Sequence, residues 1–286
     1  MSTKLNIIDV SSWNPSINWS KVAKAVDGVI IRAGYRGTRG GLTTDNLFLS
    51  HIRGAITAGV RRIGVYWWTT HNTVQQAQAD AVYLIKLLEP YRDKITFGVW
   101  LDSEAPGANN PGTSGKAFLA LSASARTICH LAFLSALRAA GYTAGVYASD
   151  SWFVERLSLS RLADYPFWVA SYSYAPKAVR INAGWQFTDK ATVSGISNGV
   201  DKSYFYTDLA AGQLPQKPTH DLRTLRKGDK GQQVRALQKL LGGITVDGDF
   251  GPETRGAVEA YQRQYKLEVD GIVGPRTWGV LLGSAG

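Results

Sequence analysis

Short apolar segments recur along the first two thirds of this chain, and their spacing constrains the fold more than any other feature. They lie at residues 6–11, 29–35, 62–68, 98–104, 143–149, 166–172 and 184–188. Most are continuously apolar rather than alternating, which is typical of strands covered on both sides. Helical patterns of apolar residues separate several of them, at residues 45–59, 73–88 and 116–140. Strands that alternate with helices predict parallel βα units, and this many units favours a closed α/β barrel over an open sheet.

The connections become too short for full helices after residue 160. We therefore expect the outer ring of helices to be incomplete on that side of the barrel. Residues 209–220 contain two prolines and no periodicity, which indicates a linker of moderate stiffness. The predicted division is a barrel over residues 1–209, a linker over 210–222 and a second domain over 223–286.

An internal repeat marks the second domain. Residues 246–258 and 269–281 share the pattern V-D-G-x-x-G-P-x-T, offset by 23 residues. Pro252 and Pro275 suit the first turn of a helix, because proline lacks a backbone N–H and an N–H at that position would have no partner within the helix. Together with an amphipathic pattern upstream, this predicts a small three-helix domain. The aspartates and glycines of the two copies, Asp247, Gly248, Asp270 and Gly271, are expected to shape turns rather than to bind ligand.

Two carboxylates follow one of the buried segments, at Asp102 and Glu104 of the sequence GVWLDSE. On a strand, residues i and i+2 point to the same face, roughly 7 Å apart along the backbone. Cleavage of a glycosidic bond requires one carboxyl to protonate the leaving oxygen and a second to act at the anomeric carbon. The alternative is a solvated loop that carries two ordinary acids.

Composition excludes several other kinds of site. Cys129 is the only cysteine and the four histidines show no ligand spacing, so we predict no disulfide, no metal and no cofactor. No apolar run approaches the ~20 residues of a membrane span, so no membrane insertion is expected. The net charge of +10 favours a polyanionic partner, either nucleic acid or an anionic cell surface. The basic residues are dispersed, without a cluster interleaved with aromatic residues, which disfavours nucleic acid.

Several motifs occur in the order seen in one enzyme family. They are DVSSWN at 9–14, IIRAGY at 30–35, G-x-Y at 64–66, LDSE at 101–104, GVYAS at 145–149, WVASY at 168–172, WQFT at 185–188 and GVD at 199–201. Over residues 5–208 the chain resembles family 25 of the glycoside hydrolases, the lysozyme-like N-acetylmuramidases. The resemblance implies a modified TIM-like barrel with five βα units followed by three strands. It also implies hydrolysis of the β-1,4 bond between N-acetylmuramic acid and N-acetylglucosamine in bacterial peptidoglycan.

The tail, over about residues 223–283, resembles the peptidoglycan-binding type 1 domain of wall-lytic enzymes. Residues 1–10 lack the features of a secretory signal. This combination resembles phage endolysins, which are made in the host cytoplasm and reach the wall through holin-dependent release. The dispersed positive charge would then assist binding to anionic wall polymers. Alternatives are a bacterial autolysin, a catalytically silent wall-binding protein, and a chitinase-like glycosidase.

The resemblance also implies roles for four acids. Glu104 matches the catalytic acid, and Asp102 the neighbouring acid that steadies the substrate's N-acetyl group. Asp9 and Asp201 match two further acids of the cluster, although Asp9 as a strand-end cap is an alternative. Clustered carboxyls raise one another's pKa, which keeps an acid protonated near neutral pH. Either the N-acetyl group or one of the outer acids, Asp9 or Asp201, would act as the nucleophile.

The remaining candidates for substrate contact are aromatic or polar. Arg32 lies inside an apolar segment, where it needs a carboxylate partner; this is either one of the four acids or a structural ion pair elsewhere. Gln186 matches a polar position of the family without an assigned role. We expect about half of the aromatic residues near strand ends to contact substrate and the others to be core. These are Tyr66, Trp68, Tyr147, Trp168, Tyr172 and Trp185.

Overall fold

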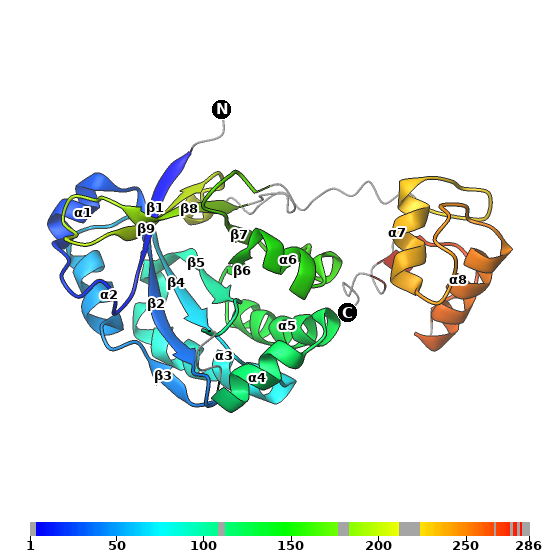
Figure 1. Cartoon of the computed structure of the whole chain (residues 1–286), viewed down its shortest axis with the longest axis horizontal. Coiled ribbons are helices and arrows are strands. Elements are labelled where there is room, and N and C mark those ends of the chain that lie inside the picture. The colour runs from blue at the N-terminus through cyan, green and yellow to red at the C-terminus, as the bar shows by residue number, and fades with distance from the viewer. Residues whose placement is uncertain are drawn as a thin grey trace. The chain divides into compact units, whose positions relative to one another are not determined.

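The computed structural model describes residues 4–107, 112–176, 183–211, 224–265, 267–274, 277, 278 and 281. The chain divides into two compact units, residues 1–217 and 218–286, which Figure 1 shows in blue to yellow and in orange to red. The predicted linker over 210–222 lies almost entirely outside the described residues. Its bounds therefore remain predictions, and each unit is described by itself.

Within the described part of the first unit, eight strands close into a barrel. Strand β1 pairs with β2 on one side and with β9 on the other, which completes the ring. Pairing is parallel from β1 through β8, whereas β9 runs antiparallel to both of its neighbours. A ninth strand, β3, pairs with β2 outside the ring. The strands are β1 (Leu5–Val10), β2 (Gly28–Arg36), β3 (Leu42–Thr44), β4 (Ile63–Trp68), β5 (Ile95–Asp102), β6 (Ala144–Ser149), β7 (Phe167–Ala170), β8 (Gly184–Ala191) and β9 (Val200–Phe205).

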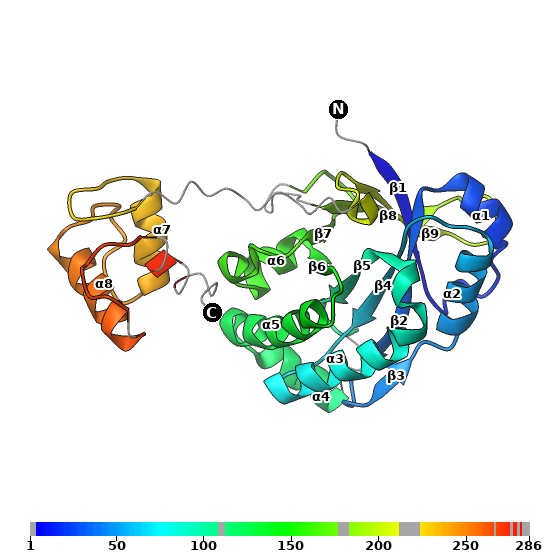
Figure 2. The ribbon, with the colours of Figure 1, turned by 180° about the vertical axis from the view of Figure 1, so that it is seen from behind.

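Helices follow the first five strands of the ring, as Figures 1 and 2 show. They are α1 (Trp19–Ala25), α2 (Phe48–Thr57), α3 (Val74–Leu88), α4 (Gly112–Ala120), α5 (Ala123–Ala139) and α6 (Asp150–Arg156). The short 3-10 helices are η1 (Glu89–Lys94), η2 (Leu159–Leu162) and η3 (Leu209–Ala211). Beyond α6, the described residues of this unit form no further α-helix. The predicted architecture of five βα units, three further strands and an incomplete helical ring is confirmed.

The predicted helix over residues 116–140 is wrong in one respect, because the structure has two helices there. α4 and α5 meet at an angle of 116°. Ser122 ends the run, since its side chain accepts a hydrogen bond from the backbone N–H of Ala125 and caps α5. In the described residues, no single helix is long and apolar enough to span a membrane. The bent pair α4 and α5 reaches that length and composition only when both helices are counted together.

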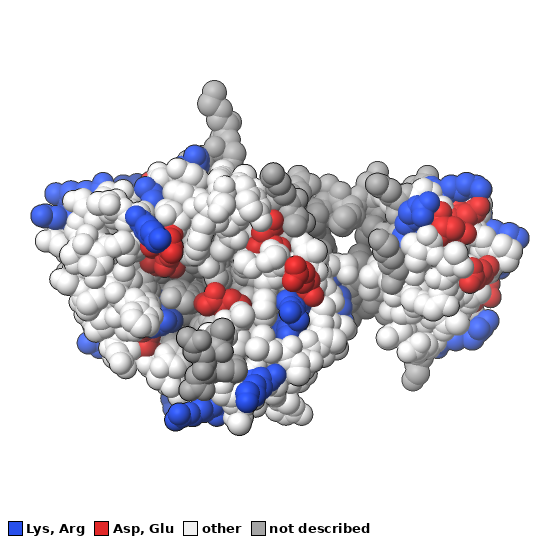
Figure 3. All heavy atoms as spheres, viewed as in Figure 1, with Lys and Arg blue, Asp and Glu red and all other residues white. Residues whose placement is uncertain are grey.

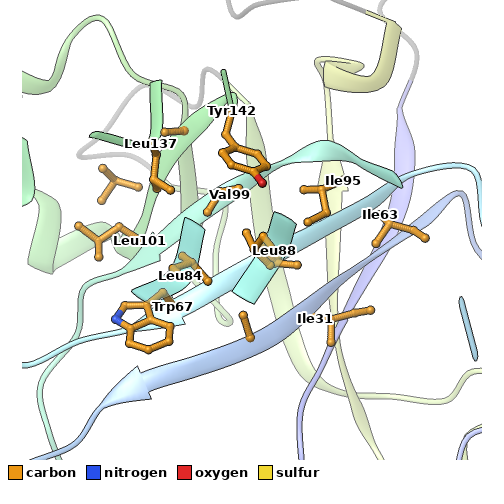
Figure 4. Close-up of a cluster of buried hydrophobic side chains, with 14 of the residues drawn as sticks. Ile31, Ile63, Trp67, Leu84, Leu88, Ile95, Val99, Leu101, Leu137 and Tyr142 are labelled. Carbon is orange, nitrogen blue, oxygen red and sulfur yellow. The ribbon is translucent and has the colours of Figure 1, made fainter. Parts of the chain in front are cut away.

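Two apolar cores lie on the two sides of the barrel wall. The outer core fills the space between strands and helices, where Trp67, Val99 and Leu101 of the strands meet Leu84 and Leu88 of α3 (Figure 4). The inner core fills the barrel and contains four aromatic rings, Phe97, Trp100, Trp168 and Phe205. Their centroids lie 5.0–5.9 Å apart in the pairs that contact each other.

Glycine makes room for this aromatic filling. A Cβ atom on Gly145 would lie 2.5 Å from the Trp100 ring, and one on Gly184 would lie 2.6 Å from Phe205. The barrel is therefore a packed core at this level, and polar residues that project inward from the strand ends rest on an apolar floor.

The second unit contains the helices α7 (Gln232–Leu241) and α8 (Pro252–Gln264). Most of the predicted third helix lies outside the described residues, although Trp278 and Leu281 are present in the core of this unit. The other core residues are Leu225, Val234, Leu237, Phe250, Val258 and Val273. Trp278 is 3% exposed and belongs to this core.

The two copies of the sequence repeat in this unit form the same set of hydrogen bonds. In the first copy, Gln238 donates to Asp247 Oδ1 at 2.7 Å and to Thr254 Oγ1 at 3.0 Å, and it accepts from the backbone N–H of Gly248. In the second copy, Gln262 makes the corresponding bonds to Asp270, Thr277 and Gly271. Both glycines have positive φ, +79° and +68°, which favours glycine at these turns. The aspartates and glycines of the repeat therefore shape turns, as predicted.

Candidate active site

The four predicted acids gather at one end of the barrel. Asp9 is the second-last residue of β1, and Asp102 is the last residue of β5. Glu104 follows two residues after Asp102. Asp201 lies near the start of β9 and pairs in register with Asp9. Because β9 runs antiparallel, its beginning reaches the same edge as the ends of the parallel strands.

Burial and mutual repulsion raise the pKa of all four carboxyls. Desolvation is the largest cause in each case. The charge of Asp201 further raises the pKa of Asp9 and of Glu104, and the charge of Glu104 raises that of Asp102. The pKa of Asp201 rises to about 6. The cluster therefore holds its protons to higher pH than isolated carboxyls would, and it titrates as a group rather than as four independent acids.

The two acids of the LDSE motif differ in their surroundings. Asp102 is 6% exposed, and its Oδ1 atom is buried without a hydrogen-bond partner among the described residues. Glu104 is exposed as a residue, although the protein around its carboxyl still desolvates it enough to raise its pKa. One acid is thus fixed in the wall of the site, and the other faces the solvent from which a substrate would enter.

Gln186, for which no role was predicted, organises one side of the cluster. Its side-chain N–H donates to Asp9 Oδ2 at 2.9 Å. Its carbonyl oxygen accepts from the hydroxyls of Tyr147 at 2.8 Å and Tyr172 at 2.9 Å. The two tyrosines fix the orientation of the amide, so that a donor rather than an acceptor faces Asp9. This donor lowers the pKa of Asp9 against the larger effect of burial.

Four of the six predicted aromatic residues lie at the acid end of the barrel. Tyr66 and Tyr147 pack on the inner core, and burial near the acids raises the pKa of both hydroxyls. Trp68 pairs in register with Asp102 and packs edge to face against Tyr35 at 6.2 Å. Tyr172 is 51% exposed. These four side chains remain candidates for substrate contact.

The structure places the other two of these six aromatic residues away from the acids. Trp168 is 2% exposed, and its indole N–H donates to Ser203 Oγ inside the barrel, so it is part of the inner core. Trp185 packs against Phe187 and Tyr204. Since neighbouring residues on a strand face opposite sides, Trp185 points out of the barrel while Gln186 points in.

Arg32 forms the structural ion pair that was the alternative interpretation. Its Nε donates to Asp45 Oδ2 at 2.7 Å, and an Nη atom donates to Ser12 Oγ at 2.8 Å. Asp45 also accepts from the backbone N–H groups of Ser12 and Leu47, which lowers its pKa together with Arg32. Asp45 was not predicted as a partner of Arg32, because nothing near it in the sequence indicates an arginine partner. The charge of Arg32 still acts on the cluster, since it opposes the rise in the pKa of Asp102 and Glu104.

Two further observations concern the surface charge and possible metal ligands. On the face drawn in Figure 3, Lys and Arg side chains are scattered over both units rather than gathered in one patch. In the part of the chain that the structure describes, no three His, Cys, Asp or Glu side chains are grouped so that they could hold a metal ion. We therefore assign no residues to a metal or cofactor.

Two family descriptions match this chain. Residues 8–196 match "Glycosyl hydrolases family 25", and residues 230–281 match "Putative peptidoglycan binding domain". Among curated proteins, the autolytic lysozyme of Clostridium acetobutylicum is 27% identical over 279 residues, which cover 95% of this chain and 77% of that protein.

Solved structures show the same barrel. The modular autolysin LytC of Streptococcus pneumoniae is 27% identical with a TM-score of 0.60, over 71% of this chain and 47% of that one. This chain therefore spans about half of that autolysin. The catalytic domain of the endolysin ply40, from bacteriophage P40 of Listeria monocytogenes, has a TM-score of 0.58 at 22% identity, over 74% of this chain and 98% of that one. The first family match covers well over half of the sequence, and the chain belongs to family 25 of the glycosyl hydrolases, the lysozyme-type glycoside hydrolases.

Proposed function

We propose that this protein is a muramidase that hydrolyses the β-1,4 bond between N-acetylmuramic acid and N-acetylglucosamine in peptidoglycan and so lyses bacterial walls. The observation that carries the proposal is the set of four acids with raised pKa at one end of a family 25 barrel. The tail that matches a peptidoglycan-binding domain supports the same substrate. The pneumococcal autolysin, one of the similar structures, is known in complex with a synthetic peptidoglycan ligand.

Glu104 is the proton donor in this mechanism. Its raised pKa lets the carboxyl keep its proton to higher pH than an ordinary glutamic acid, and its exposure lets the glycosidic oxygen approach. After the bond breaks, the same carboxylate removes a proton from the attacking water. Asp102 and Glu104 leave the chain one residue apart and approach the sugar from neighbouring positions. That geometry suits an acid and a positioning partner better than an acid and a nucleophile on opposite faces.

The substrate's N-acetyl oxygen then serves as the nucleophile. Asp102 Oδ1 has no hydrogen-bond partner among the described residues. An acetamide N–H of the substrate would supply the donor it lacks and would bind more tightly as the acetamide gains positive charge. Asp9 and Asp201 as covalent nucleophiles are the alternative. Gln186 already occupies one oxygen of Asp9, which favours a structural and electrostatic role for that acid.

One comparison of substrates tests the proposal. The full-length protein is incubated with purified peptidoglycan and, separately, with chitin, and the new reducing ends are identified by mass spectrometry. Muramic acid at the new reducing ends of peptidoglycan fragments, with chitin resistant, is the expected result. Cleavage of chitin alone would replace the proposal with a chitinase, and binding without cleavage would replace it with a wall-binding protein. A glycosyl adduct trapped on Asp9 or Asp201 would refute the assisted mechanism.

The tail is proposed to hold the enzyme at the wall. A second binding module converts each later encounter with the insoluble glycan into an intramolecular one, which raises the effective concentration of the barrel at its substrate. The relatives include both an autolysin and a phage endolysin, and the same chemistry serves either role.

A further inference from the structure

A chain of buried polar side chains runs through the outer layer of the barrel and ends between the two acids of the LDSE motif. Its members are Asp80 on α3, His71 after β4, His130 on α5 and Ser103 after β5. All four are 0% exposed. None of them takes part in the proposed reaction, and the sequence analysis found no pattern that joins them.

The hydrogen bonds of this chain are short and continuous. His71 Nδ1 lies 3.1 Å from Asp80 Oδ2, and His71 Nε2 lies 2.9 Å from His130 Nδ1. His130 Nε2 lies 2.7 Å from Ser103 Oγ. Trp152 of α6 donates its indole N–H to the same Ser103 oxygen at 3.0 Å.

One assignment of protons satisfies every member when both imidazoles are neutral. The carboxylate of Asp80 accepts from His71 Nδ1–H, which leaves His71 Nε2 to accept from His130 Nδ1–H. His130 Nε2 then accepts from the Ser103 hydroxyl, whose oxygen accepts from Trp152. Burial and the neighbouring His71 lower the pKa of His130 well below its usual value, in agreement with a neutral ring.

Asp80 anchors the far end of the chain. Its carboxylate also accepts from Arg36 Nε of β2 at 2.7 Å, from Thr69 Oγ1 after β4 at 2.9 Å, and from the indole N–H of Trp67. A buried carboxylate with this many donors is held in one orientation. The chain thereby links the ends of β2, β4 and β5 to α3, α5 and α6.

Ser103 is where this network meets the active site. Its side chain points to the outer layer, while Asp102 and Glu104 on either side of it point to the barrel end. The sheet holds the backbone as far as Ser103, whose N–H donates to the Tyr147 carbonyl at 2.9 Å. β5 ends at Asp102, so Glu104 lies in the loop that follows. The Ser103 side chain is therefore the anchor closest to the proton donor.

We propose that Ser103, His130, His71 and Asp80 form a positioning chain that holds Asp102 and Glu104 in the geometry required for glycosidic cleavage. The Ser–His–His–Asp order is similar to that of a nucleophile with its base, but Ser103 is fully buried and cannot reach a substrate. These four hydrogen-bonded side chains act only by orienting Asp102 and Glu104. This inference rests on the proposed muramidase activity for its kinetic consequence, but the arrangement of protons stands independently of it.

The first test is kinetic and uses the full-length protein on soluble peptidoglycan fragments. Ser103→Ala removes the last link and should lower kcat on the order of 10-fold to 100-fold, because small displacements of catalytic groups are costly, with KM changed less than about 2-fold. Ser103→Thr keeps the hydroxyl and should recover most of the loss. The matched control is Leu137→Ala, a buried residue on α5 in the outer core that is not a member of the hydrogen-bonded chain. It should lower the thermal midpoint and leave kcat unchanged at temperatures where the protein is folded.

Asp80→Asn adds a test at the opposite end of the chain. If the members act as one unit, the double variant Asp80→Asn, Ser103→Ala should lose no more kcat than the more damaged single variant. Fully additive losses would overturn the proposal. It would also be overturned if Leu137→Ala lost as much kcat as Ser103→Ala, since the effect would then be one of stability.

The second test needs no substrate and separates this inference from the proposed function. Nitrogen-15 NMR of the histidines at neutral pH should show His71 and His130 neutral and protonated on Nδ1, and Ser103→Ala should shift the His130 resonances. A wild-type protein that leaves peptidoglycan uncleaved would refute the muramidase proposal alone. Protonation of either ring on Nε2, or of both nitrogens, would refute the positioning chain whatever the activity.

Discussion

The charge of Asp201 should lower the stability of the barrel above about pH 6, and Asp201→Asn should remove that loss. Burial, followed by the charge of Asp189, raises the pKa of Asp201 from an ordinary 3.8 to about 6. The unfolded chain has no such environment, so the folded state binds the Asp201 proton more tightly. The free energy of unfolding therefore falls as pH rises from about 4 to about 6, and stays lower above that range.

The size of the effect follows from the pKa itself. Each pKa unit corresponds to about 1.36 kcal/mol, so the rise from 3.8 to about 6 corresponds to about 3 kcal/mol at neutral pH. Asp201 is only partly buried, and solvent screening reduces this to about 1–3 kcal/mol. Asparagine keeps the shape and an acceptor oxygen for Asp9. It also removes a charge that raises the pKa of Asp9 and Glu104.

Urea unfolding between pH 4 and pH 8 measures this difference. Tryptophan fluorescence reports mainly on the barrel, because eight of the nine tryptophans lie within residues 1–209. Asp201→Asn should match the wild type near pH 4 and be more stable by about 1–3 kcal/mol at pH 7. The control Asp93→Asn changes an exposed acid and should stay within about 0.5 kcal/mol throughout. The reasoning is refuted if Asp201→Asn shows no gain at pH 7, or a gain that is the same at every pH.

Three further predictions concern the amide, the tail and the surface charge. Gln186→Leu should destabilise the barrel by about 2–4 kcal/mol in urea, because Asp9 and the Tyr147 hydroxyl lose a buried partner; a loss below about 0.5 kcal/mol would contradict it. Residues 1–209 alone should cleave soluble fragments at the full-length rate and intact walls more slowly; equal rates on walls would show that the tail does not target. Raising salt to several hundred millimolar should slow lysis of anionic walls and leave hydrolysis of neutral fragments unchanged. Equal salt sensitivity on both substrates would place the charge effect in the enzyme itself.

The barrel was predictable because its signals are local and repeated. A continuous apolar segment indicates a strand that is buried on both sides. Three helical stretches, at 45–59, 73–88 and 116–140, were indicated by the period of their apolar residues. The break between α4 and α5 was missed because Leu121 and Ala125 continue the apolar stripe across it. The feature that marks the break is a single residue, Ser122, which caps the N-terminus of α5. The residues of β9 were not among the predicted apolar segments, since its sequence VDKSYF has three polar residues in a row.

The site was predictable only where residues are close in sequence or match the family motifs. Asp102 and Glu104 share a strand end, so their common face follows from geometry. The ion pair of Arg32 with Asp45 and the bond from Gln186 to Asp9 join residues that are 13 and 177 positions apart. No local pattern encodes such partners. Trp168 and Trp185 occur in apolar strand segments just as Trp68 does. Whether such a tryptophan lies in the core, on the outer surface or at the site depends on the side of the strand and the depth in the barrel at which it lies.

The most direct test of the central claim is the activity of Glu104→Gln on intact peptidoglycan, measured together with its binding to the same walls. The substitution removes the exchangeable acid and keeps the shape of the side chain. Wall binding should match that of the wild type, and release of fragments with new muramic acid reducing ends should fall to background. Asp102→Asn should lower the rate on the order of 10²-fold, as expected for the loss of an electrostatic partner in the transition state. A Glu104→Gln variant that cleaves peptidoglycan at the wild-type rate would contradict the assignment of this barrel end as the active site.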